Sequence, residues 1–377
     1  MNGNGNRRDA LRIMSAAMIS TSMAGRLSAI EEQDIVDKQT NKSPLPRIKI
    51  GQIGVGHAHA DKLAVYRNSP DYEVVGIVEP DEKLRLAAQN KPAFKDLPWM
   101  TREELLAQPG LQSVLIETEV RHLLDQAEAC ISAGQHVHLD KPAGESLEQY
   151  RRILQNAERQ SLLVQMGYMF RYNPGYLLLK KFIQQGWLGE IFEVHAVMSK
   201  VLDPRTREQL GAYPGGIMFE LGCHVIDLVL NILPQPDRIT SFSRQVVTGQ
   251  DRLFDNMLAV FEYPKATATI RSTGVEVEGF ARRHVTVCGT RGTFHIQPLD
   301  NPSVRLSLAE SVTDPDTGKV YRKGVQEIEL PKYARYVGDA DDMAKIIRGD
   351  KPSDYSYAHD LAVQTAVLQA SGLLKSH

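Results

Sequence analysis

Short apolar runs alternate with helix-like segments through the first half of the chain. The apolar runs are rich in β-branched residues and predict buried strands, whereas the segments between them have helical spacing. The predicted strands cover residues 47–55, 72–78, 114–116, 136–139 and 162–166, and the helices cover 59–68, 82–89, 102–107, 121–133 and 147–159. Regular alternation of strand and helix predicts an α/β unit with a parallel sheet, here over residues 47–165.

The pattern changes after residue 166, where strands dominate. The predicted strands cover residues 191–200, 238–247, 255–263, 266–273, 284–288, 293–297, 304–308 and 325–330, and the helices cover 176–185, 217–232, 337–347 and 357–374. Many strands with few helices between them predict an α+β domain with a mostly antiparallel sheet, residues 166–377.

A glycine turn follows the first predicted strand, in the order Gly54-Val55-Gly56-His57-Ala58-His59. Two glycines allow a tight turn and a close approach to a pyrophosphate at the start of the next helix. The second strand ends at Glu79, where an acid can bind ribose hydroxyls and repel a 2′-phosphate. We therefore expect NAD rather than NADP, although Glu79 in a plain turn remains the structural alternative.

Lys141 stands at the end of another predicted strand, in Asp140-Lys141-Pro142. Proline cannot continue a central strand, so the strand ends there. Ligands of open parallel sheets bind at the carboxyl ends of the strands. The ammonium group therefore suits an electrophilic or acid–base role, and the alternative is a surface lysine at a strand exit.

The helix predicted at residues 217–232 carries Glu220, His224 and Asp227 at i, i+4 and i+7. At 100° per residue these side chains lie within about 60° of one another. The rest of the helix is apolar, so its polar face should border a cavity. A solvated polar face is the alternative.

Composition excludes several classes of function. The chain has 377 residues, 42% of them hydrophobic, and a formal net charge of −2, which gives no basis for nucleic-acid binding. Its three cysteines are scattered, which argues against a disulfide framework or a structural zinc site. The histidine pairs 57/59 and 136/138 could converge on a metal, but we expect none. No run is long and apolar enough to span a membrane.

The first 24 residues resemble a twin-arginine export signal, because Arg7-Arg8 precedes a mildly apolar run that ends in small residues. Residues 25–46 read as a polar linker. We therefore expect a periplasmic or secreted protein. A basic tail with a chance arginine pair, on a cytoplasmic protein, is the alternative.

Four motifs together resemble those of the Gfo/Idh/MocA family (glucose–fructose oxidoreductase and inositol dehydrogenase). They are AGQHVHLDKP, GGIMFELGCHVIDL, VTVCGTRGTF and IIRGDKPSDYS, and the resemblance covers residues 48–374. It implies an NAD(P)-dependent enzyme with a Rossmann domain and an open-faced sheet domain. It also implies a homo-oligomer, a dimer or tetramer, formed through that sheet.

The resemblance also implies roles for individual residues. Lys141 and His224 match the catalytic lysine and histidine, and Glu220 takes the place of an aspartate. The expected cofactor-binding residues are Gly54, Gly56, His57, His59, Glu79, Thr118, Lys141 and Arg171, and the expected substrate contacts are Tyr168, Asn173 and Asp227.

The first functional hypothesis is hydride transfer from a CH–OH group of a sugar, a polyol or a sugar derivative. His224 would act as the general base, Lys141 would stabilise the alkoxide, and Glu220 would orient His224. Residues 202–214 should cover the site.

The export signal supports an alternative, a tightly bound NAD that is regenerated in each cycle, as in oxidation–elimination of glycosides or sugar dismutation. A third hypothesis is a non-catalytic sugar sensor, against which the retention of both Lys141 and His224 argues.

Overall fold

The computed structural model describes residues 45–212, 214–247 and 251–375. The expected export signal and all but the last two residues of the expected linker lie outside the described residues. Contacts group residues 47–377 into one compact unit, which is the part described below. No helix among its described residues is long and apolar enough to cross a membrane.

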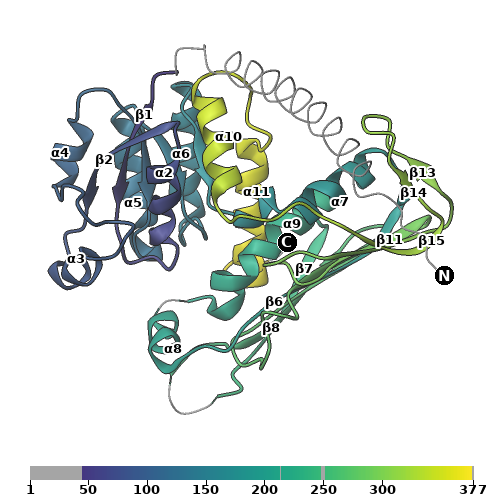
Figure 1. Ribbon diagram of the computed structural model, residues 1–377. Coiled ribbons are helices and arrows are strands. Elements are labelled where there is room, and N and C mark those ends of the chain that lie inside the picture. The colour runs from purple at the N-terminus through teal and green to yellow at the C-terminus, as the bar shows by residue number, and fades with distance from the viewer. Residues whose placement is uncertain (1–44, 213, 248–250, 376–377) are drawn as a thin grey trace, which may run out of the picture. The chain divides into compact units, whose positions relative to one another are not determined.

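Five parallel strands form the first sheet, in the order β2-β1-β3-β4-β5. The strands are β1 (Ile48–Ile53), β2 (Tyr72–Val78), β3 (Leu111–Ile116), β4 (His136–Leu139) and β5 (Val164–Met166). The helices between them are α2 (Leu63–Asn68), α3 (Glu82–Ala88), α4 (Arg102–Leu106), α5 (Val120–Ser132) and α6 (Leu147–Arg159). Figure 1 shows the first two strands, β1 and β2, with α2 and α5 nearby. The predicted parallel α/β unit is confirmed. The helix after the glycine turn begins as a 3-10 turn, Ala60–Lys62, before α2.

Strand β1 pairs in parallel with both β2 and β3, so the direction of winding reverses at β1. The carboxyl ends of β1 and β3 therefore lie side by side. In open α/β sheets such a switch point is where ligands bind.

Eight strands form the second sheet, in the order β15-β12-β11-β10-β6-β9-β8-β7. They are β6 (Ile191–Ser199), β7 (Arg238–Arg244), β8 (Asn256–Glu262), β9 (Thr267–Thr273), β10 (His284–Gly289), β11 (Gly292–Ile296), β12 (Val304–Leu308) and β15 (Gly324–Ile328). Every pairing is antiparallel except that of β6 with β9. The predicted, mostly antiparallel sheet is confirmed, and β13 (Val312–Thr313) and β14 (Val320–Tyr321) form a small separate hairpin.

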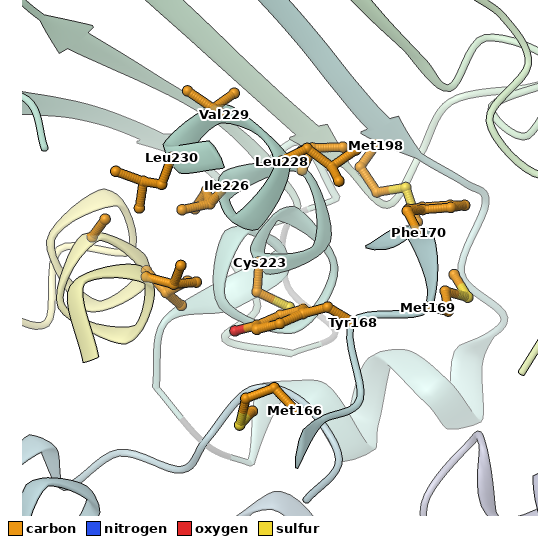
Figure 2. Close-up of a cluster of buried hydrophobic side chains, with 14 of the residues drawn as sticks. Met166, Tyr168, Met169, Phe170, Met198, Cys223, Ile226, Leu228, Val229 and Leu230 are labelled. Atoms are coloured by element: carbon orange, nitrogen blue, oxygen red, sulfur yellow. The ribbon is translucent and has the colours of Figure 1, made fainter. Parts of the chain in front are cut away.

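The core continues from the first sheet to the second (Figure 2). Met166 ends β5, Tyr168 and Phe170 lie in the crossing segment, and Met198 lies on β6; all four side chains are buried. Burying a side chain of this size contributes about 1.5–3 kcal/mol. The crossing segment, which includes the 3-10 turn Met169–Tyr172 and leads into α7 (Pro174–Gln184), therefore joins the two halves through packing.

The predicted helix at 217–232 is divided in the structure. It begins as a π-helical turn, η3 (Met218–Gly222), and continues as α9 (Cys223–Ile232). A π turn is wider than an α turn, so the 100° spacing assumed for Glu220 and His224 does not hold there.

A short helix that the sequence analysis did not predict, α8 (Pro204–Gly211), lies within the expected loop 202–214. Asp203 caps it by accepting a hydrogen bond from Thr206 N, and Pro204 occupies its first position. Both are start signals that the sequence displayed.

The last two helices, α10 (Val337–Ile347) and α11 (Tyr357–Ala370), close the fold. Helix α10 returns to the first half, where Ala340 and Met343 share a core with Ile48 and Tyr72. The Tyr72 hydroxyl donates a hydrogen bond of 2.6 Å to the Ala340 carbonyl. A domain boundary at residues 165/166 thus separates the two sheets. Helix α10, although it lies in the second half of the sequence, packs against the first sheet.

Candidate active site

The glycine turn is pressed against the loop after β3. Gly54 has φ of +93°, and a Cβ added there would lie 2.6 Å from Thr118 N. The His57 amide donates to the Glu117 carbonyl at 3.0 Å, and Gln52 Nε2 donates to the Gly54 carbonyl at 2.9 Å. These contacts fix the turn at the switch point of the sheet.

A cavity of about 830 Å³ opens beside this turn. Glu79, Trp99, Arg102 and Thr118 are among its lining residues. The Glu79 carboxylate accepts hydrogen bonds from Val55 N at 2.9 Å and Asp81 N at 3.0 Å, one on each oxygen. Each oxygen keeps a further lone pair, so Glu79 can still accept from ribose hydroxyls. The turn, with its two glycines, and this carboxylate fit the adenosine half of a dinucleotide.

A second cavity of about 470 Å³ adjoins the first, and Gly56 and Glu119 line both. His57 forms part of its wall from the first half, and Glu220 and Leu210 form part of it from the second half. Helix α8 therefore lines this cavity.

Lys141 is buried at the end of β4. Its Nζ donates to the Glu220 carbonyl at 2.8 Å and to Glu220 Oε1 at 3.0 Å. Burial opposes a charged ammonium, but the negative charges of Glu220 and Asp140 and the hydrogen bond to Glu220 together outweigh it and raise the pKa of Lys141. Lys141 is therefore a cation and a hydrogen-bond donor at neutral pH. The sequence analysis predicted that Glu220 orients His224, whereas the structure shows Glu220 in contact with Lys141.

His224 is also buried, but it is neutral. Its ring lies 5.8 Å from the ring of His59 and 5.7 Å from that of Phe170. Burial, together with the charge of Lys141, lowers the pKa of His224 well below its usual value. Within the described residues His224 Nδ1 is buried without a hydrogen-bond partner. A neutral imidazole beside a charged lysine is a suitable proton acceptor.

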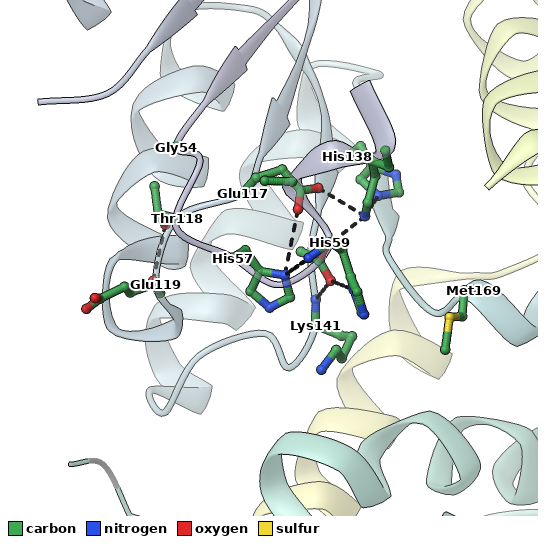
Figure 3. A network of polar contacts seen from close by, with 12 residues as sticks. Gly54, His57, His59, Glu117, Thr118, Glu119, His138, Lys141 and Met169 are labelled. Atoms are coloured by element: carbon green, nitrogen blue, oxygen red, sulfur yellow. Dashed lines mark hydrogen bonds and ion pairs between the residues drawn. The ribbon is translucent and has the colours of Figure 1, made fainter. Parts of the chain in front are cut away.

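A buried polar network lies under the glycine turn (Figure 3). Asp140 Oδ2 lies 3.1 Å from His57 Nδ1 and 2.8 Å from Lys62 Nζ, and Asp140 Oδ1 lies 3.2 Å from His59 Nδ1. Lys62 Nζ also lies 3.0 Å from Glu117 Oε1. Sequence reasoning missed Lys62 and Glu117, although Glu117 directly follows β3, at the edge where ligands bind.

The two carboxyl groups of this network differ in protonation. Burial and the charge of Asp140 raise the pKa of Glu117 well above its usual value. Burial opposes ionisation of Asp140 too, but His57, Lys62 and His59 hold its pKa well below the usual range. Glu117 therefore holds a proton and Asp140 the negative charge.

The histidine pairs considered as metal ligands are only partly brought together. Donor atoms of His57, His59 and Asp140 lie within 4.8 Å of one another and could hold an ion. His136 instead accepts a hydrogen bond from Leu163 N, and His138 contacts Lys62 Nζ at 3.0 Å. The ammonium of Lys62 already serves as the cation for Asp140, so we propose no metal here.

Arg171 is engaged in internal ion pairs. Its Nη2 lies 2.6 Å from both Asp227 Oδ1 and Asp360 Oδ1, and all three groups are buried. Asn173 Nδ2 donates to the Leu299 carbonyl at 2.8 Å, and its Oδ1 caps α7. These contacts occupy Arg171, Asn173 and Asp227 in holding helices together, so we leave them out of the proposed cofactor and substrate contacts.

Tyr168 is 2% exposed, and its ring lies 6.3 Å from that of His224. It therefore packs beside the histidine, and the expected contact of Tyr168 with a substrate stays a prediction.

Comparisons with known proteins find related sequences and similar folds. The family described as "Oxidoreductase family, NAD-binding Rossmann fold" matches residues 48–168, and "GFO/IDH/MocA C-terminal domain" matches residues 176–295. The uncharacterized oxidoreductase YdgJ of Escherichia coli (strain K12) is 29% identical over 291 residues, 74% of this chain and 79% of its own length. The inositol 2-dehydrogenase of Salmonella paratyphi B is 24% identical, over 70% of this chain and 78% of its own.

Among solved structures, that of an NAD binding oxidoreductase from Klebsiella pneumoniae is similar, with a TM-score of 0.72 and 17% identity. The match covers 87% of this chain and 96% of that one. The switch-point turn, the Lys141–Glu220 pair, His224 and both family matches lead to one conclusion. This chain belongs to the Gfo/Idh/MocA family of NAD(P)-dependent oxidoreductases.

Proposed function

We propose that the protein is an NAD-dependent dehydrogenase that oxidises a CH–OH group of a sugar or polyol. The observation that carries this proposal is geometric. A buried imidazole, His224, whose Nδ1 has no hydrogen-bond partner among the described residues, lies near the buried ammonium of Lys141, which Glu220 holds. The relationship to inositol 2-dehydrogenase supports a polyol as substrate.

The residues divide the work as follows. Two of the three ammonium protons of Lys141 are directed at Glu220, which leaves one to donate to the substrate oxygen and stabilise its developing negative charge. The unprotonated imidazole nitrogen of His224 accepts the proton that the hydroxyl loses. When bound, NAD accepts the hydride from the same carbon.

The test is NADH formation with a panel of sugars and polyols. Wild type should reduce NAD with at least one of them. Lys141→Met and His224→Asn should still bind NAD but lose turnover. Unchanged turnover in both variants would refute the proposed roles.

A second candidate function depends on the Arg7-Arg8 pair, which favours export. An exported enzyme has no free NAD pool and would carry its cofactor through a redox-neutral cycle, in glycoside cleavage or sugar dismutation. Purification without added nucleotide distinguishes the two. About one NAD per chain, with phenol release from an aryl glycoside, supports the second candidate, and an empty protein supports the first.

We also propose that two chains pair through the uncovered face of the eight-stranded sheet. His195, Thr269 and Thr286 lie in register across β6, β9 and β10, at half-buried positions. Light scattering on the purified protein should give a multiple of the chain mass, and a monomer at all concentrations would contradict this.

A further inference from the structure

Lys200 immediately follows β6 and has a firmly held backbone. Its amide donates to the Thr273 carbonyl at 3.0 Å. On the other side Gly279 packs so closely that an added Cβ would lie 2.8 Å from both Cα and N of Lys200. The Lys200 side chain therefore starts from a fixed point and lines the smaller cavity together with Glu220.

The side chain of Lys200 is half-buried, and its ammonium is unpaired among the described residues. The two buried lysines, Lys62 and Lys141, each have a carboxylate oxygen within 3.0 Å, from Asp140 and Glu220 respectively. In contrast, Lys200 Nζ has no hydrogen bond or ion pair in the part of the chain that the structure describes. Burial lowers its pKa, and the negative charge of Glu220 only partly compensates. A partly desolvated ammonium without a partner costs free energy that an anionic ligand would recover.

The other charges of this cavity do not supply that partner. The Glu220 carboxylate accepts a hydrogen bond from Lys141. Glu119 lies 3.2 Å from Arg121, and both are about half exposed at the rim. Glu208 on α8 is exposed, so water screens its charge several-fold more than that of a buried group. Lys200 and Glu220 therefore line the inner part of the cavity, and the buried Lys141 lies behind Glu220, 3.0 Å from its Oε1. The single carboxylate of Glu220 thus faces two cations.

We propose that Lys200 forms an anion subsite and that the preferred substrates are sugar acids, which carry a carboxylate besides the CH–OH group that is oxidised. This rests on the proposed function and names its substrate class. A single unpaired ammonium matches the single charge of a carboxylate, and its position beside Glu220 places that charge close to Lys141. The pyrophosphate of the cofactor is the competing anion.

The test compares two substrates that differ only in the acid, methyl glucuronide and methyl glucoside. Wild type should prefer the glucuronide. Lys200→Met should lower kcat/KM for the glucuronide by about 10- to 100-fold, the value of a charge-assisted hydrogen bond, and leave the glucoside nearly unchanged. Lys200→Arg should retain the preference. Lys265→Met, an exposed lysine in the turn between β8 and β9, is the matched control.

Binding is measured in parallel, so that the inference can fail independently of turnover. Calorimetry on the NADH-loaded protein should detect glucuronide binding that Lys200→Met weakens. Absence of that binding, or equal binding of both substrates, overturns the inference even where NAD is reduced with neutral polyols. Weaker NAD binding in Lys200→Met, with equal losses on both substrates, assigns Lys200 to the cofactor and also overturns it. Binding without turnover of any substrate contradicts only the proposed function.

Discussion

Lys141 and His224 are both buried, yet they have opposite charge states. Glu220 provides Lys141 with a counter-charge, so its ammonium persists despite burial. His224 has an apolar and aromatic environment next to that cation, so its neutral form is favoured. Although both side chains are buried, Lys141 is thus a hydrogen-bond donor and His224 a proton acceptor.

We expect Lys141→Met to lower kcat by about 10²- to 10⁴-fold, because its third ammonium proton stabilises the developing alkoxide. The dissociation constant of NAD and the unfolding temperature should change little. Stopped-flow kinetics measures kcat, titration calorimetry measures the dissociation constant of NAD, and thermal unfolding measures the unfolding temperature. The exposed Lys95→Met is the control, and an equal loss in that variant would contradict the assignment.

The pH profile should reveal the neutral histidine. Because the pKa of His224 lies well below 6.5, the usual value of histidine, the imidazole stays unprotonated as the pH falls through 6.5. We therefore expect kcat/KM to remain level across that pH and to decline only at distinctly lower pH. A decline centred near 6.5 that disappears in His224→Asn would show an ordinary histidine and refute the proposed environment.

Glu79 should decide between the two dinucleotides. Its carboxylate lies at the end of β2 and supports the turn through Val55 N. Glu79→Gln keeps an oxygen for that bond but removes the charge that repels a 2′-phosphate. The preference for NAD over NADP should fall by about tenfold or more. Glu73→Gln, exposed on the same strand, should leave the ratio of the two kcat/KM values unchanged.

At the scale of elements, periodicity located both sheets because their strands are buried in simple patterns. Strand β8 alternates strictly between buried and half-buried residues, as a sheet with one covered face requires. The π turn at Met218–Gly222 was not predictable, because a widened turn has no hydrophobic signature of its own. Helix α8 was predictable from Asp203-Pro204, and only its short length concealed it.

The glycine turn offers a test at this scale. Gly54→Ala combines a positive φ with a contact of 2.6 Å to Thr118 N. Gly134 has φ of +80° but nothing within 4 Å of an added Cβ, so Gly134→Ala is matched for strain without the clash. We expect about 1 kcal/mol of lost stability for Gly134→Ala and about 2–3 kcal/mol for Gly54→Ala. Urea unfolding measures both, and equal losses would contradict the clash.

Across the whole molecule, the candidate site was predicted in part. Lys141, His224 and Glu220 were predictable because each lies in a motif formed by neighbouring residues of the sequence. The network of Lys62, Glu117 and Asp140 joins three separate elements, and no periodicity of any one of them signals such a meeting. Similarly, the sequence marked Asp227 as polar on an apolar helix, but its partner Arg171 lies far away in the chain.

Buried neutral histidines should make the protein sensitive to acid. Burial lowers the pKa of His138 to about 3, whereas the unfolded value is 6.5. Below pH 6.5, His138 binds a proton in the unfolded chain but not in the native state. The free energy of unfolding therefore falls as the pH decreases. The free-energy difference between wild type and His138→Gln should change by about 1.4 kcal/mol per pH unit between pH 6 and 4. Exposed His122→Gln should show no such slope.

Helix α10 packs against the first strands of the five-stranded sheet, although it lies more than 150 residues after the last strand of that sheet. The first half is therefore synthesised well before its packing can be completed. When the ribosome has finished β5, the side chains of Ile48 and Tyr72 still lack the cover that Ala340 and Met343 provide. At 5–20 residues per second, the missing helix emerges roughly 10 to 35 seconds later. During that interval the nascent chain exposes an apolar surface that is prone to aggregation. A chaperone that binds this surface would act before the cofactor-binding half is complete.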